Sequence, residues 1–131
     1  MATPMTIKQE KFNLLLNKYK EKAEIVPIPC AGLMEFIEDG VLSGKELEEY
    51  LEEKLSLYNK DDISSIVLGC THYPLLMNPI KRYMGDSVTL VNPAYETAKE
   101  LKNILQKSGL LNEKVTTPTY DFYVSDGVDK F

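Results

Sequence analysis

The sequence has little of the chemistry on which many small proteins depend. It contains no tryptophan, one histidine and two cysteines in 131 residues. Cys30 and Cys70 are far apart in the chain, so the paired ligand spacing of a zinc site is missing. The two cysteines could pair with each other, but a cytosolic chain favours free thiols. We therefore expect free thiols and no metal site.

Long apolar runs and a basic surface are also missing. No run approaches the roughly 20 apolar residues that a membrane helix needs, and the start lacks the continuous apolar core of a signal peptide. The net charge is −5 and the pI about 4.9, which argues against binding to nucleic acid. No glycine-rich loop opens a helix to hold a phosphate. We therefore expect a cytoplasmic protein that binds neither membrane nor nucleic acid.

The composition is that of a folded protein, with 27% charged and 44% hydrophobic residues. Short β-branched runs predict strands, and segments of helical periodicity separate them. This alternation predicts an α/β fold with a parallel sheet sandwiched by helices. The predicted strands are residues 25–28, with Pro27 inside, and residues 63–68, 88–91 and 120–124.

Two capping boxes and several glycines predict where the helices begin and end. Thr6 with Gln9 predicts one helix start, and Ser43 with Glu46 predicts another. Shorter helices are expected over residues 32–39 and 78–84, and a longer one from Pro93 to a stop at residue 109. The first two helices each carry an apolar stripe that predicts a buried face, formed by Phe12, Leu15, Leu16 and Tyr19 in one and by Leu47, Tyr50, Leu51 and Leu55 in the other.

Reactive side chains follow the predicted strand at residues 63–68. The stretch from Ser64 reads S-S-I-V-L-G-C-T-H-Y-P-L-L, so Cys70, Thr71 and His72 stand where a strand ends. In parallel α/β sheets the ligand crevice lies at this end of the strands. A thiol near a histidine and backbone N–H groups can ionise near neutral pH and act as a nucleophile or a base. The alternative is a structural role, with Cys70 as a small buried residue and His72 as a hydrogen-bonded one.

The run from Gly69 to Leu76, G-C-T-H-Y-P-L-L, resembles the signature in the second lobe of glutamate racemases. These enzymes interconvert L- and D-glutamate without a cofactor and supply D-glutamate for peptidoglycan. Ala2, Thr3 and Thr6 resemble the Ala-Thr-x-x-Thr segment at the start of that lobe, and Glu38 with Gly40 resembles its Glu-x-Gly. The Asp-Ser-Gly and Cys-Asn-Thr-Ala runs of the first lobe have no counterpart here.

The resemblance implies roles for particular residues. Cys70 is the acid or base on one face of the substrate's α-carbon, His72 assists its proton transfers, and Glu38 orients His72. Thr71, Thr3 and Thr6 bind the substrate, glutamate. No cofactor is implied. Cys30 is not the second catalytic cysteine, because the family has a cysteine at this turn in addition to the catalytic pair.

The resemblance also implies a division of the chain. Residues 1–92 correspond to the second α/β lobe, and residues 93–131 to a C-terminal return segment that packs on the first lobe in the family. We expect this chain to be a fragment that is inactive alone. One alternative is a non-catalytic module that forms a homodimer through uncovered apolar residues, among them Leu101, Leu105, Phe122 and Val124. Another is an aspartate or hydantoin racemase, which histidine at position 72 disfavours.

Overall fold

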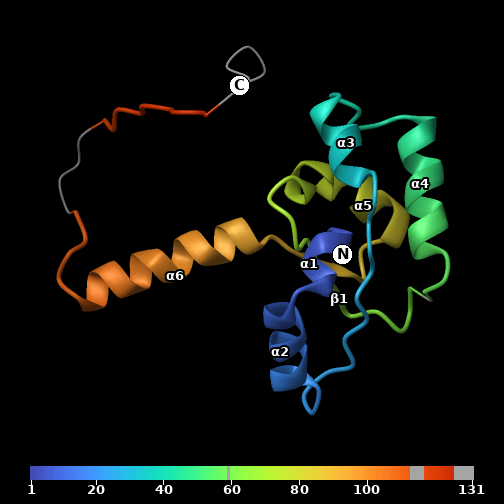
Figure 1. Cartoon of the computed structure of the whole chain (residues 1–131), viewed down its shortest axis with the longest axis horizontal. Helices are drawn as coiled ribbons and strands as arrows, with labels where there is room; N and C mark the ends of the chain where they lie inside the picture. The colour runs from blue at the N-terminus through green and yellow to red at the C-terminus, as the bar shows by residue number, and fades with distance from the viewer. Residues whose placement is uncertain (59, 113–116, 126–131) are drawn as a thin grey trace. The chain divides into compact units, whose positions relative to one another are not determined.

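The computed structural model of the chain describes residues 1–58, 60–112 and 117–125, and it divides the chain into two compact units, Met1–Lys99 and Glu100–Phe131. Helices and a parallel sheet make up the first unit, as the α/β prediction requires (Figure 1). Its elements, in chain order, are α1 (Pro4–Lys8), α2 (Glu10–Tyr19), α3 (Leu33–Glu38), α4 (Lys45–Leu55), β1 (Ser65–Val67), the 3-10 helix η1 (Tyr73–Leu76), α5 (Met77–Met84) and β2 (Thr89–Val91). Helix α6 (Pro93–Lys107) begins in this unit and ends in the second.

The sheet is built around β1. On one side β1 pairs with β2 in parallel, and Ile66 lies opposite Leu90. On the other side lies the start of the chain: the Met1 amine donates to the Val67 carbonyl at 3.0 Å, and the Gly69 N–H donates to the Met1 carbonyl at 2.8 Å. Ala2 in turn forms a parallel bridge with Pro29. Four segments therefore lie side by side in the order 28–30, 1–2, 65–69 and 89–91.

Apolar residues from the strands and from the helices fill one core. Helix α4 contributes Leu47, Leu51 and Leu55, which recur every four residues and are all buried. This confirms the buried face that its periodicity predicts. Other fully buried members come from α3, the end of β1, η1, α5 and the approach to β2; they are Leu33, Leu68, Tyr73, Leu76, Ile80 and Val88.

The start of the first helix differs from the prediction. Thr3, not Thr6, is the N-cap of α1, and its hydroxyl oxygen accepts from the Thr6 N–H at 3.2 Å. Pro4 explains the shift, because proline is favoured at the first helical position. Ser43 does not cap α4 either, since Gly44 occupies the N-cap without a side-chain hydrogen bond.

The predicted buried face of the first long helix is wrong. Helix α2 has no buried residue, and Leu15 of the predicted stripe is 53% exposed. The predicted strand at residues 25–28 is also absent: that segment reaches the sheet only through the single bridge at Pro29. Two hydrogen bonds form this bridge, from the Ala2 N–H to the Ile28 carbonyl at 3.0 Å and from the Cys30 N–H to the Ala2 carbonyl at 2.9 Å.

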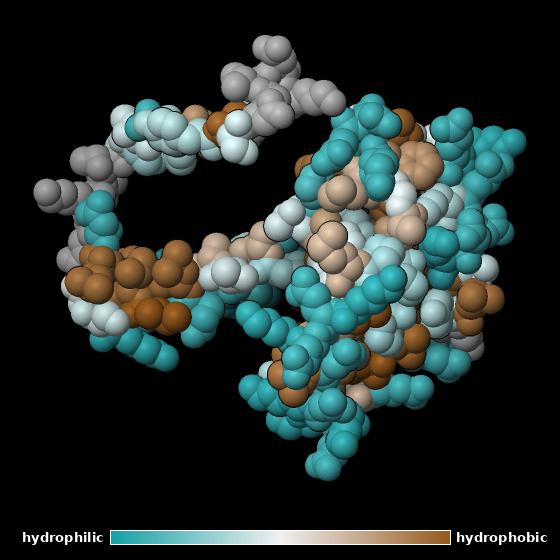
Figure 2. All heavy atoms as spheres, viewed as in Figure 1, coloured by the Kyte–Doolittle hydropathy of each residue, from teal (hydrophilic) through white to brown (hydrophobic). Residues whose placement is uncertain are grey.

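The second unit contains the last part of α6 and the described residues that follow it. Leu101 and Ile104 are 55% and 51% exposed, and hydrophobic residues gather at the end of α6 in Figure 2. The predicted strand at residues 120–124 is wrong, because these residues form no ladder in the described part of the chain. Among the described residues, no helix is both long and apolar enough to cross a membrane.

Candidate functional site

The candidate site begins where β1 ends, at Gly69. The Gly69 N–H lies 2.8 Å from the Met1 carbonyl oxygen, and a Cβ at this position would lie only 2.9 Å from the same oxygen. Any side chain here would push the first residues of the chain away from β1. Glycine therefore lets the segment that carries Ala2 and Thr3 approach the segment that carries Cys70.

Cys70, His72 and Glu38 form a line of thiol, imidazole and carboxylate. The Cys70 Sγ lies 3.8 Å from His72 Nδ1, and His72 Nε2 lies 3.6 Å from Glu38 Oε1. With the ring proton on Nε2, Nδ1 can accept from the thiol while Nε2–H faces the carboxylate. When the imidazole is protonated, Glu38 is within ion-pair distance of it.

Two elements bring these groups together. Glu38 is the last residue of α3, and His72 precedes η1; α3 and η1 pack against each other. The side chains of His72 and Glu38 are 34% and 57% exposed, and Cys70 is partly buried. The line is thus open to water and to a ligand at the end of β1.

The threonines form two groups. The Thr71 hydroxyl lies 3.4 Å from His72 Nδ1, so it shares that nitrogen with Cys70. The Thr3 and Thr6 hydroxyls lie 2.9 Å apart at the start of α1. The structure thus brings Cys70, Thr71, His72 and Glu38 into contact, and it places Thr3 with Thr6 on the segment that touches Gly69.

Cys30 is buried, whereas Cys70 is partly exposed. Cys30 is 2% exposed, its Sγ donates to the Ile28 carbonyl at 3.4 Å, and burial raises the pKa of its thiol. Both cysteines are free thiols, as expected. No group of three or more possible metal ligands occurs among the residues that the structure describes.

Sequence reasoning missed the hydrogen bonds that two tyrosines make near the site. The Tyr73 hydroxyl donates to the Cys30 carbonyl at 3.2 Å, and the Tyr50 hydroxyl donates to the Ala31 carbonyl at 2.9 Å. Burial raises the pKa of both phenols well above the usual value. The separations of 43 and 19 positions leave no periodic signal in the sequence that would have revealed these bonds.

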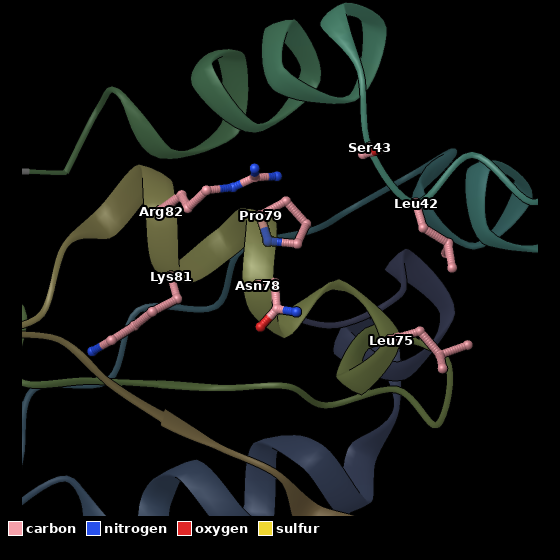
Figure 3. Close-up of a pocket in the computed structure, with 7 residues that line it drawn as sticks. All are labelled: Leu42, Ser43, Leu75, Asn78, Pro79, Lys81 and Arg82. Carbon is pink, nitrogen blue, oxygen red and sulfur yellow. The ribbon is translucent and has the colours of Figure 1, made fainter.

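A surface hollow of about 600 Å³ lies elsewhere, against α5 (Figure 3). Asn78, Lys81 and Arg82 of α5 line it, together with Leu75 and the Leu42–Ser43 segment before α4. None of the predicted site residues lines this hollow. The Lys81 amine donates to the Asp86 and Val88 carbonyls, so it belongs to the turn after α5.

The comparisons with known proteins agree on one family. Glutamate racemase from Clostridium botulinum (strain Alaska E43 / Type E3) is 43% identical over 130 residues, which are 99% of this chain and 50% of that protein. Glutamate racemase from Clostridium novyi (strain NT) is 46% identical over 112 residues, or 86% of this chain and 43% of that protein. No protein-family model matches the chain.

Solved structures give the same result. The crystal structure of glutamate racemase from Francisella tularensis subsp. tularensis SCHU S4 in complex with D-glutamate matches with a TM-score of 0.83 and 35% identity over 99% of this chain and 48% of that one. Glutamate racemase isoform RacE1 from Bacillus anthracis matches with a TM-score of 0.72 and 31% identity over 83% and 41%. The chain therefore spans about half the length of the relatives that it matches.

Proposed function

We propose that this chain, which is similar to glutamate racemases over nearly its whole length, supplies one side of a glutamate racemase active site. One observation carries the proposal: the only histidine of the chain lies between the thiol of Cys70 and the carboxylate of Glu38. The match to a structure in complex with D-glutamate supports the choice of substrate.

Racemisation needs an acid and a base on opposite faces of the α-carbon. In this proposal the Cys70 thiolate removes the α-proton of one enantiomer, and the Cys70 thiol returns a proton when the reaction runs the other way. His72, 3.8 Å from the sulfur, accepts the thiol proton as the thiolate forms. Glu38 stabilises the imidazolium that results, because opposite charges at 3.6 Å attract.

Substrate binding falls to the threonines and backbone around the end of β1. Thr71 lies next to Cys70, and its hydroxyl can bond the substrate's amino or carboxylate group. Thr3 and Thr6 offer two hydroxyls 2.9 Å apart, a separation that suits one carboxylate. No lysine Schiff base is needed in this scheme, so the proposal requires no pyridoxal phosphate.

Exchange of the α-proton of glutamate in heavy water tests the role of Cys70 on the chain itself. Proton NMR follows the loss of the α-proton signal of D- and L-glutamate separately. A single acid/base group acts on one face, so we expect exchange of one enantiomer without racemisation, and no exchange in Cys70→Ala. Cys30→Ala is the matched control and should exchange like the unmodified chain. Exchange that survives in Cys70→Ala, or racemisation at the rate of a full-length relative, would contradict the proposal.

Aspartate tests the alternative of an aspartate racemase. We expect exchange of glutamate to exceed exchange of aspartate under the same conditions. The reverse preference would assign the chain to the aspartate enzyme instead. The proposed role, supply of D-glutamate for peptidoglycan, also implies that the protein acts in the cytoplasm.

A second proposal concerns self-association. Tyr95, Leu101 and Ile104 of α6 are 65%, 55% and 51% exposed, and exposed apolar faces of this kind favour association. We propose that the C-terminal segment, residues 93–131, pairs with a second copy of the chain. Analytical ultracentrifugation tests this: a dimer that Leu101→Lys dissociates supports it, and a monomer at high concentration contradicts it.

A further inference from the structure

Two tyrosine hydroxyls hold the turn from which α3 starts. Tyr73 donates to the Cys30 carbonyl at 3.2 Å, and Tyr50 donates to the Ala31 carbonyl at 2.9 Å. Gly32 follows at once as the N-cap of α3, with a φ of 85°. The two bonds therefore tie the start of this short helix to η1, which carries Tyr73, and to α4, which carries Tyr50.

Tyr73 makes a second link, to the turn that carries His72. Its backbone N–H donates to the Cys70 carbonyl at 3.2 Å, which closes a turn with Thr71 and His72 in the middle. The Tyr73 side chain is fully buried, so its ring is fixed by the core. One residue thus connects the turn before α3 with the turn after β1.

These two turns carry the two partners of the Glu38–His72 contact. Helix α3 has only six residues, about 9 Å at 1.5 Å per residue, and Glu38 is the last of them. So short a helix moves as one body when its first turn shifts. A displacement at Cys30 would therefore change the 3.6 Å distance between Glu38 Oε1 and His72 Nε2.

We propose that Tyr73 is a positioning residue that sets the contact between Glu38 and His72, with Tyr50 as a second, weaker support. Tyr50 is weaker because it bonds the carbonyl of Ala31, an exposed residue, whereas Tyr73 bonds that of buried Cys30. The Tyr50 bond is exposed and the Tyr73 bond is buried, so water competes more with the first than with the second. The inference gives Tyr73 a part in the proposed racemase site, although the contacts themselves do not depend on the reaction.

The single histidine makes this inference measurable by NMR on the chain without substrate. His72 alone gives imidazole signals. Glu38→Gln should shift these signals, because it removes the charge beside Nε2. Tyr73→Phe removes one buried oxygen and should shift them in the same direction, although that hydroxyl bonds Cys30 and not the imidazole. Tyr50→Phe should give a smaller shift of the same sign.

Tyr58→Phe is the control, because it removes a hydroxyl from a partly buried tyrosine outside these turns. It should leave the imidazole signals in place. Unshifted signals in Tyr73→Phe, when Glu38→Gln moves them, would overturn the proposal, as would unshifted signals in Glu38→Gln. If Tyr73→Phe unfolds, Tyr50→Phe decides in its place, and no shift in that variant also overturns the proposal.

The experiment separates this inference from the proposed function. A normal imidazole response without any α-proton exchange would refute the racemase role and leave the positioning role intact. Exchange that depends on Cys70, together with no imidazole response in either tyrosine variant, would support the racemase role and refute the positioning role.

Discussion

Gly69→Ala tests how closely the start of the chain must approach the end of β1. The added Cβ would lie 2.9 Å from the Met1 carbonyl oxygen and 3.4 Å from the Ala2 Cβ. Carbon and oxygen atoms do not approach so closely without repulsion, so the Met1–Thr3 segment must move. Overpacking of this kind costs about 1–3 kcal/mol.

Movement of that segment would also weaken two hydrogen bonds. These are the 2.8 Å bond from Gly69 N–H to the Met1 carbonyl and the 3.0 Å bond from the Met1 amine to the Val67 carbonyl. Each contributes about 0.5–1.5 kcal/mol net. The chain relieves the clash or keeps the bonds but not both, so we expect the free energy of unfolding to fall by about 1–3 kcal/mol in all.

Urea denaturation followed by far-UV circular dichroism measures this change. With a slope of about 1–3 kcal/mol per molar urea, the midpoint should fall by roughly 1 M at an unchanged slope. The close contact is with a backbone oxygen, so the double variant Gly69→Ala with Ala2→Gly should not recover the stability. A midpoint within error of the unmodified chain, or full recovery in the double variant, would refute the reasoning.

Two further predictions concern the thiols and the buried phenols. Iodoacetamide should alkylate Cys70 well before Cys30, because Cys30 is buried and its raised pKa keeps the thiol protonated. Peptide mass spectrometry measures the two alkylation rates, which should be equal only in denaturant. Equal rates in buffer would contradict the structure. The raised pKa values of Cys30, Tyr50 and Tyr73 mean that the unfolded chain loses these protons at a lower pH than the folded chain, so stability should be complete below about pH 9 and fall as the pH rises further. Urea midpoints between pH 7 and pH 11 measure this, and a midpoint that stays constant or rises would contradict it.

Local sequence signals predicted most of the elements around the site. β-branched residues at 63–68 and 88–91 gave strands there, although the ladder itself is confined to residues 65–67 and 89–91. The longer helix begins at Pro93 as predicted, and the Asn92 side-chain oxygen before it accepts from the Ala94 N–H at 3.0 Å. The predicted end of the helix at residue 84 is likewise confirmed, with Gly85 as the C-cap of α5. These features depend on nearest neighbours along the chain, which a sequence displays directly.

The errors come from features that depend on distant partners. The stripe on α2 shows which face is apolar, but periodicity says nothing of what covers that face, and Leu15 is exposed. The residues at 120–124 have strand-forming side chains, but a strand needs a neighbour to pair with. Conversely, the pairing of Met1 and Ala2 with two distant segments was invisible, because two residues carry no periodic pattern.

The candidate site was predicted in part for the same reason. Cys70, Thr71 and His72 are neighbours in sequence, and the position of a strand end indicated them. Glu38 entered only through the resemblance to glutamate racemases, and the structure places it 3.6 Å from His72. The hydroxyl bond of Tyr73 to the Cys30 carbonyl crosses 43 positions, and it became visible only in three dimensions.

The most direct test of the proposed function is racemisation by this chain once it is joined to the complementary half of a glutamate racemase. Formation of D-glutamate from L-glutamate is measured for the joined protein and for its Cys70→Ala and Cys30→Ala variants. We expect racemisation in the joined protein and in Cys30→Ala, and none in Cys70→Ala. Racemisation that persists without the Cys70 thiol would contradict the account.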